Sequence, residues 1–304
     1  MGTRSPTACA AAALALTALV GGCGGDENKQ DDHGARPSKP APPPELPRGG
    51  RKLFPDRRVV AVYGAPQTPA LGILGVGSAD EAARQAKRLA RKYDRKRRRA
   101  LPALELISTV ASGAAGLRGK YNYRQTRRVV HRYLKAARKA NGLLILDIQP
   151  GRARFIDEAR RLRPFLEKPD VSLALDPEWA VGPGQIPGKT LGSIRAGDVN
   201  RVSRYLAEIV RRKNLPEKLL IIHTFTPDAV PDEVRKRIKH RAGVALVFNA
   251  DGFGSPGAKV GTYERFARRR YGNGFKLFYE EDTQLMSPRE VMALRPRPDV
   301  IVYE

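Results

Sequence analysis

The chain is poor in cysteine, histidine and tryptophan, and these absences exclude several kinds of site. Its 304 residues include two cysteines, four histidines and one tryptophan. Cys9 lies in an N-terminal apolar segment that we expect to be cleaved, so the mature chain would keep only Cys23 and could form no disulfide framework or cysteine metal site. No His-x-His pair is present, and we expect no metal. An all-oxygen site built from Asp147, Asp176 and Asp251 stays open as an unspecific alternative.

The chain also lacks the motifs of nucleophilic and cofactor-dependent enzymes. No Gly-x-Ser-x-Gly sequence surrounds Ser108 or Ser112, so a nucleophile elbow is not expected. The glycines of residues 72–77 do not have the strand-to-helix spacing of a dinucleotide site. We therefore expect no cofactor.

Acidic residues are scarce relative to basic ones. The 56 lysines and arginines against 31 aspartates and glutamates give a formal net charge of +25. Such a charge favours anionic partners, which outside the membrane are lipid head groups and acidic wall polymers, and not nucleic acid. Many of the basic residues fall in helical stretches, as in residues 84–92, where a solvated outer face is the favoured explanation.

No long hydrophobic run is present, but a short one opens the chain. The 14 residues from Thr7 to Val20 are apolar and too few to span a bilayer as a mature helix. The run ends at Leu19-Val20-Gly21-Gly22-Cys23, which resembles the lipobox of bacterial lipoproteins. This resemblance implies a signal peptide over residues 1–22, lipid such as palmitate on Cys23, and a membrane-anchored protein on the extracytoplasmic face. A signal cut elsewhere and a secreted protein is the alternative.

Residues 23–56 are rich in glycine, proline and charge and include Pro40-Ala41-Pro42-Pro43-Pro44. This composition predicts a disordered tether with some polyproline stiffness. Residues 57–304 have no further low-complexity break and match the usual size of one barrel domain.

Within that domain, short apolar runs alternate with amphipathic stretches. Strands are expected near residues 59–63, 103–109, 143–148, 171–176, 218–224, 244–249, 275–279 and 298–303. Helices are expected after the capping boxes at Ser78 and Ser287 and over residues 124–140, 153–166, 198–213, 231–240 and 262–270. Eight strands alternating with seven helices predict an α/β fold, a TIM-like (β/α)8 barrel without its last helix. The strand-to-helix joints are the long ones, so we expect a site at the C-terminal face.

The sequence Asp176-Pro177-Glu178-Trp179 is the most informative strand ending. Strand side chains alternate between faces, so Ala174, Asp176 and Glu178 share one side, and Pro177 ends the strand. By the same rule Asp147 pairs with Gln149, Asn249 with Asp251, and His223 with Phe225. Converging carboxylates repel one another, which raises at least one pKa and prepares an acid and a base.

Two carboxylates on opposite sides of a sugar linkage are what glycoside hydrolysis requires. We expect Glu178 to be the acid, Asp176 or Asp147 the base or nucleophile, and Asp251 and Glu280 the second-choice acids. Aromatic side chains would stack on sugar faces and polar ones would bind hydroxyls: Trp179, Tyr63, Phe225, Gln149, Asn249 and His223. The expected partner is a cell-wall glycan or another anionic envelope polymer.

The Asp176-x-Glu178 pair, followed by a long helix and by Leu220-Ile221-Ile222-His223-Thr224-Phe225, resembles the barrel lysozymes (muramidases) over residues 171–225. The resemblance implies that Glu178 is the acid and that Asp176 assists it. The chain departs from that family at Tyr63-Gly64, where the family has an aspartate near the end of the first strand. Residues 62–66 and 71–75 also resemble uncharacterised bacterial lipoproteins, which implies no activity.

Two alternatives stay open. Asp176 and Glu178 could accept hydrogen bonds from loop amides or Arg195 and order the loop after the fourth strand. His223 alone at a strand end is also compatible with a core histidine. At the level of function, the alternative to a hydrolase is a non-catalytic lipoprotein that binds glycan or a partner protein.

Overall fold

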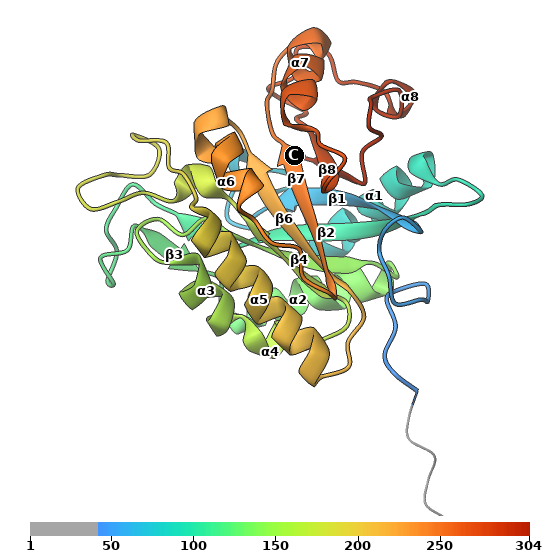
Figure 1. Ribbon diagram of the computed structural model, residues 1–304, viewed down its shortest axis with the longest axis horizontal. Helices are drawn as coiled ribbons and strands as arrows, with labels where there is room; N and C mark the ends of the chain where they lie inside the picture. Colours follow the sequence, from blue (N-terminus) through green and yellow to red (C-terminus); the bar gives the residue numbers. More distant parts are fainter. Residues whose placement is uncertain (1–41) are drawn as a thin grey trace, which may run out of the picture. The chain divides into compact units, whose positions relative to one another are not determined.

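The computed structural model describes residues 42–304, which form a closed β-barrel surrounded by helices (Figure 1). Eight parallel strands make the barrel: β1 (Arg57–Gly64), β2 (Arg99–Ala111), β4 (Leu143–Ile148), β5 (Val171–Leu175), β6 (Lys218–Thr224), β7 (Val244–Ala250), β8 (Gly272–Leu277) and β9 (Val300–Tyr303). Each pairs with the next, and β9 returns to β1, which also pairs with β2. The predicted (β/α)8 fold class is confirmed.

The alternation of side chains along the strands divides the apolar residues into two sets. On β1, Val59 and Ala61 face the barrel interior, whereas Val60 and Val62 face the helices. Strands that are apolar on both faces are typical of a parallel sheet covered on both sides, and this explains why the runs read as continuous in the sequence. The interior is filled by small and branched residues such as Ala103, Ala174 and Ala245.

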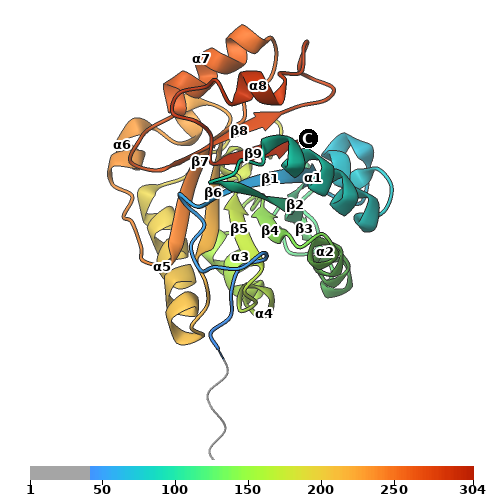
Figure 2. The same cartoon turned by 90° about the vertical axis from the view of Figure 1, so that its right-hand side faces the viewer.

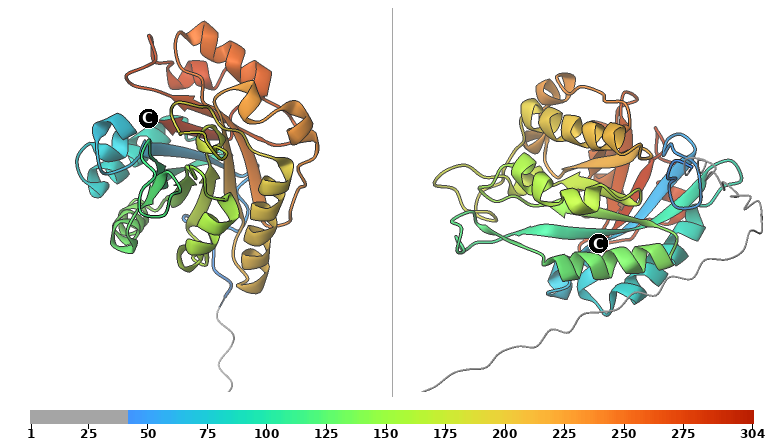
Figure 3. Two further views of the ribbon diagram at one scale, coloured as in Figure 1. Left: turned by 90° about the vertical axis from the view of Figure 1, so that its left-hand side faces the viewer. Right: turned by 90° about the horizontal axis from the view of Figure 1, so that it is seen from below.

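Helices surround the strands on the outside (Figures 2 and 3). They are α1 (Ala79–Tyr93), α2 (Arg127–Lys139), α3 (Phe155–Arg161), α4 (Arg163–Leu166), α5 (Ala196–Arg212), α6 (Asp232–Lys236), α7 (Pro256–Phe266) and α8 (Pro288–Val291). Capping boxes begin α1 at Ser78 and α8 at Ser287, as predicted from Glu81 and Glu290 three residues on. No helix follows β9 within residues 42–304.

Several elements differ from the prediction. The helix predicted over residues 153–166 is divided into α3 and α4, and the helix predicted over residues 231–240 is shortened to α6. The segment predicted as a helix over residues 262–270 begins at Pro256, capped by Ser255, and ends at Phe266. A three-residue strand, β3 (Asn122–Arg124), was not predicted; it pairs antiparallel with the end of β2. Glu158, which is fully buried, accepts hydrogen bonds from Arg124 at 2.8 and 2.6 Å and so holds β3 against α3.

The chain before β1 closes the N-terminal end of the barrel. Leu46 and Leu53 are buried in the interior cluster together with the strand-start residues Val59 and Leu101. The Leu53 amide donates a hydrogen bond of 2.7 Å to Glu217, just before β6. Two leucines of the segment predicted as tether, residues 23–56, are therefore packed against this end of the barrel. The predicted signal peptide, residues 1–22, and Cys23 lie outside the described residues.

The long connections follow the carboxyl ends of the strands, as predicted from the joint lengths. The connection from β5 to α5 alone covers residues 176–195 and contains the short 3-10 turn η3 (Pro177–Trp179). Within residues 42–304, no helix is both long and apolar enough to cross a bilayer.

Candidate active site

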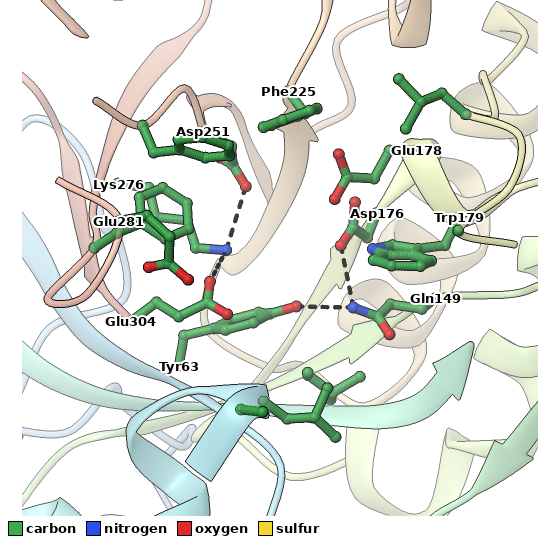
Figure 4. Close-up of a pocket in the computed structure, with 17 residues that line it drawn as sticks. Tyr63, Gln149, Asp176, Glu178, Trp179, Phe225, Asp251, Lys276, Glu281 and Glu304 are labelled. Carbon is green, nitrogen blue, oxygen red and sulfur yellow. Dashed lines mark hydrogen bonds and ion pairs between the residues drawn. The ribbon is translucent and has the colours of Figure 1, made fainter. Parts of the chain in front are cut away.

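A cavity of about 380 Å³ opens at the carboxyl ends of the strands (Figure 4). Its lining combines carboxylates, one lysine and several aromatic rings. The residues are Tyr63, Ala70, Leu71, Ile107, Gln149, Asp176, Glu178, Trp179, Gly188, Leu191, Phe225, Asp251, Phe253, Lys276, Phe278, Glu281 and Glu304. Each barrel strand contributes a lining residue at or near its carboxyl end. On β2 this residue is Ile107, four residues before the strand ends, and after β9 it is Glu304.

Asp176 and Glu178 enter the cavity from the end of β5. Pro177 has no amide hydrogen and begins η3, which turns Glu178 inward on the same side as Asp176. Burial raises the pKa of both carboxyls; the neighbouring Glu178 adds to the effect at Asp176, and Asp251 adds to it at Glu178. The pKa of Glu178 reaches about 7, and that of Asp176 lies well above its ordinary value. Glu178 is therefore about half protonated near neutral pH, and Asp176 takes up a proton more readily than an ordinary aspartate.

Asp251 shows the opposite behaviour on the other side of the cavity. Burial alone would raise its pKa, but the cations His223 and Lys276 outweigh burial and hold it below the ordinary value. His223 Nδ1 lies 2.6 Å from Asp251 Oδ2, and Asn249 donates a hydrogen bond to Oδ1. Asp251 is thus an ionised carboxylate with both oxygens occupied by fixed donors.

His223 is shared between two acids below the cavity floor. Its Nε2 lies 3.0 Å from Glu105 on β2, and its ring is 1% exposed. Burial would lower the pKa of His223, but Asp251 and Glu105 raise it well above the ordinary value. The imidazolium therefore compensates two buried carboxylates. It has no contact with the cavity, so the alternative of a satisfied core histidine describes its position.

Lys276 is the cation that reaches the cavity itself. Its Nζ lies 2.5 Å from Glu304, 3.5 Å from Asp251 and 3.8 Å from the centre of the Tyr63 ring (Figure 4). Burial would lower the pKa of this amine, but Glu304 and Asp251 raise it above the ordinary value. Lys276 is consequently charged and is not a free amine nucleophile.

Tyr63 and Gln149 link the two sides of the floor. Tyr63 donates a hydrogen bond of 3.0 Å to Asp147, and Gln149 donates to the Tyr63 hydroxyl at 3.2 Å and to Asp176 at 3.4 Å. Asp147 is fully buried beneath Tyr63, and burial raises its pKa to about 6. The floor is a connected polar network in which each group fixes its neighbour.

Aromatic rings form the rim. Phe253 stands between Phe225, at 5.6 Å between ring centres, and Phe278, at 5.9 Å. Half of the Phe253 surface is exposed, and Trp179 lies beside Asp176 and Glu178, across the cavity from Lys276 and Glu281. Flat apolar surfaces above a polar floor suit the apolar faces and hydroxyl edges of a sugar.

The structure brings most of the predicted site residues into one cavity and leaves four outside it. The residues that line it are Tyr63, Gln149, Asp176, Glu178, Trp179, Phe225 and Asp251. Asp147, His223 and Asn249 lie below the floor, so Asp147 is not placed to act as base on a ligand. Glu280 is exposed and outside the cavity; its neighbour Glu281 lines it instead.

Sequence reasoning missed Glu105, Lys276 and Glu304. The signal was present, because Leu104-Glu105-Leu106 and Phe275-Lys276-Leu277 each place a charge inside an apolar strand. Such a charge costs several kcal/mol unless it has a partner, so each indicates a buried ion pair. The partner of Glu105 is His223, and the partners of Lys276 are Asp251 and Glu304. Asn249 also explains a glycine: a Cβ on Gly274 of β8 would stand 2.1 Å from Asn249 Oδ1.

The contacts of Asp176 and Glu178 bear on two alternatives, that these acids order the loop after β5 and that acids at this face hold a metal ion. Across residues 42–304, neither Asp176 nor Glu178 forms an ion pair, and the one hydrogen bond to their side chains comes from Gln149 and not from a loop amide or Arg195. The two acids therefore do not order the loop after β5. In the same part of the chain, no group of three histidine, cysteine or acidic side chains has the arrangement to hold a metal ion.

No protein-family model and no curated protein matches the chain. Solved structures that are similar to it include an oxaloacetate acetylhydrolase in complex with 3,3-difluorooxalacetate, at 15% identity and a TM-score of 0.47, covering 83% of this chain and 77% of that one. A GH5 endo-β-1,4-glucanase from Bacillus licheniformis has 12% identity and a TM-score of 0.44 over 83% and 55% of the chains. A sialic acid aldolase mutant from Ruminococcus gnavus has 11% and 0.43 over 84% and 69%. Likeness at this level carries no argument about activity.

Proposed function

We propose that the cavity is the active site of a glycoside hydrolase that acts on a cell-envelope polysaccharide. The observation that carries the proposal is the contrast between Glu178, whose pKa is raised to about 7, and Asp251, whose pKa is lowered, in the same cavity. Environments that separate the pKa values of two carboxyls prepare one as acid and the other as base.

In this mechanism Glu178 donates its proton to the glycosidic oxygen as the bond to the sugar carbon breaks. The ionised Asp251 stabilises the positive charge on that carbon, either by bonding to it or by taking a proton from the attacking water. Burial and Glu178 raise the pKa of Asp176, and Gln149 donates a hydrogen bond to it, so its role is to position a sugar hydroxyl and not to act as the base. This assignment replaces the roles expected for Asp176 and Asp147 and keeps the role expected for Glu178.

The test is release of reducing ends from purified wall glycans. Glu178→Gln preserves shape and removes the proton, and we expect the rate to fall by about 10²- to 10⁴-fold. Glu280→Gln is the matched control, because Glu280 is a neighbouring exposed acid outside the cavity. Equal rates for wild type and Glu178→Gln, or no activity of the wild type on a broad glycan panel, would overturn the catalytic assignment.

The aromatic rim favours one second candidate, a lipoprotein that binds glycan without cleaving it. Stacking on Trp179 and Phe253 would then hold the ligand. Binding by this route survives Glu178→Gln and weakens about tenfold with Trp179→Ala, as measured by titration with glycan fragments. In a hydrolase, Trp179→Ala would weaken glycan binding and Glu178→Gln would lower the rate of cleavage.

The extracytoplasmic site of action rests on the sequence around Cys23, which lies outside the described residues. We propose that lipid on Cys23 holds the protein at the membrane. Acyl-chain burial persists in about 1 M salt, whereas attraction between exposed charges is screened within a few Å. Membranes washed in high salt should retain wild type and lose Cys23→Ala. Equal retention of both would refute the anchor and attribute membrane binding to the basic surface.

A further inference from the structure

The opposite end of the barrel carries a cluster of basic side chains that the proposed hydrolase does not use. A groove of about 290 Å³ is lined by Arg58, Arg95, Arg97, Arg98, Arg297 and Met292. We call it the arginine groove. It contains five guanidinium groups and no carboxylate among its lining residues, whereas the active-site cavity is lined by five acids and one lysine.

The arginine groove is assembled from three separate parts of the chain. Arg58 begins β1, Arg95, Arg97 and Arg98 form the turn between α1 and β2, and Arg297 belongs to the connection between α8 and β9. Pairing of β1 with both β2 and β9 brings these segments together at the amino ends of the strands. The barrel closure thus concentrates like charges that are far apart in sequence.

Arg58 is the buried arginine of the groove and is only 2% exposed. Its Nε donates a hydrogen bond of 2.9 Å to the Pro298 carbonyl, and the rest of its fork has no partner within residues 42–304. Burial, followed by the neighbouring Arg98, lowers the pKa of Arg58 to about 10. A buried cation normally has an anion beside it, since an uncompensated one is costly.

The acid nearest to the arginine groove is already engaged. Asp299 forms an ion pair with Arg98 through Oδ1 and accepts a hydrogen bond of 2.9 Å from the Asn273 amide through Oδ2. Arg97 and Arg297 are exposed and form no ion pair in the described part of the chain. The arginine groove therefore presents guanidinium hydrogen-bond donors from three segments of the chain. Asp299 is the one acid beside its five arginines.

We propose that the arginine groove binds a phosphate group. Guanidinium forks match the oxygens of phosphate in bidentate pairs. A tetrahedral phosphate offers oxygens to segments on three sides, whereas a planar carboxylate offers two oxygens in one plane. The negative charge on its oxygens would also offset the repulsion among the arginines. Inorganic phosphate and the head group of an anionic lipid share this chemistry.

Titration of the purified chain with inorganic phosphate at constant ionic strength tests the proposal. The groove variant is Arg97→Gln/Arg297→Gln, because both side chains are exposed and hold no other part of the fold. The matched control is Arg127→Gln/Arg211→Gln, which removes the same charge from exposed positions outside every cavity described here. We expect wild type and control to bind phosphate alike and the groove variant to bind at least tenfold more weakly. Absence of binding by wild type, or equal binding by both variants, would overturn the proposal.

Sedimentation with vesicles then separates the two sources of phosphate. Cys23→Ala versions of both double variants are mixed with phosphatidylglycerol or phosphatidylcholine vesicles, so that lipid on Cys23 does not contribute. Given phosphate binding, weaker sedimentation of the groove variant alone with phosphatidylglycerol assigns the site to a lipid head group. Equal sedimentation of the two variants assigns it to a soluble phosphate compound.

Discussion

The two ends of the barrel differ in how their buried charges are compensated. At the carboxyl ends of the strands, Lys276 lies 2.5 Å from Glu304 and 3.5 Å from Asp251, and His223 lies between Asp251 and Glu105. At the amino ends, Arg58 is equally buried and meets a carbonyl oxygen and other arginines. A network in which buried acids and cations neutralise one another holds its side chains in fixed positions, as catalysis requires. A cluster of cations without enough acids attracts a ligand of opposite charge.

Strand β1 shows the contrast within eight residues. Arg58 near its start lies in the arginine groove, and Tyr63 near its end lies in the active-site cavity. The two face different layers, because side chains alternate: Tyr63 belongs to the barrel interior and Arg58 to the layer between strands and helices. The two sites are therefore separated by the barrel core, and variants at one should leave the other intact.

Replacement of Lys276 should have the largest effect on stability. Lys276→Met leaves Glu304 and Asp251 without their buried cation, so we expect the free energy of unfolding to fall by about 3 to 5 kcal/mol. Chemical denaturation at pH 7 measures it. Lys213→Met is the control: its ion pair with Glu167 is exposed and 3.9 Å long, and its removal should cost less than about 1 kcal/mol. Similar losses of unfolding free energy for both variants would show that the buried ion pairs of Lys276 stabilise the fold no more than an exposed pair does.

The pH dependence of stability should report the raised pKa of Glu178. The folded protein keeps a proton on Glu178 up to about pH 7, whereas an unfolded glutamate loses it near pH 4.5. This contribution to stability is complete below pH 4.5 and is lost as pH rises to about 7, amounting to about 3 kcal/mol. Asp147, with a pKa of about 6, acts in the same direction.

Glu178→Gln isolates the part that belongs to Glu178, because glutamine stays neutral at every pH. The variant and wild type should have similar melting temperatures near pH 4.5, and the variant should melt higher at pH 8. Glu280→Gln should follow the wild-type curve at both pH values. A variant that gains nothing at pH 8 would show that Glu178 ionises as easily when folded as when unfolded, and the acid of the proposed mechanism would be lost with it.

The sequence predicted the barrel and most of the cavity for one physical reason. Parallel strands place their carboxyl ends together, and alternation decides which side chains face inward, so the endings at Asp176, Phe225 and Asp251 identified cavity residues. Alternation ends where the strand ends. Glu280, three residues beyond β8, was consequently misplaced, and Glu281 lines the cavity instead.

Other features depended on distances that the sequence does not contain. Glu105 and Lys276 lie within strands, and the site prediction considered only the residues at strand ends. The charge that each places in an apolar run was nevertheless present in the sequence. Leu46 and Leu53 are two apolar residues in a polar segment, and only the open end of the barrel explains their burial. The arginine groove combines residues up to 239 positions apart, from Arg58 to Arg297, and the order of strand pairing alone brings them together.

Replacement of Arg58 should have the smallest effect on stability, and this small effect is the sharpest test of the comparison. Arg58→Met removes a buried cation that forms no ion pair within residues 42–304, so the relief from burial should offset the lost hydrogen bond to Pro298. The free energy of unfolding in phosphate-free buffer should then stay within about 1 kcal/mol of wild type. Phosphate should then raise the melting temperature of wild type more than that of the variant, because bound phosphate stabilises the folded protein and the variant binds it more weakly. A loss of about 3 kcal/mol or more without phosphate would mean that the protein balances Arg58 internally, as it does Lys276, and the two ends of the barrel would no longer differ.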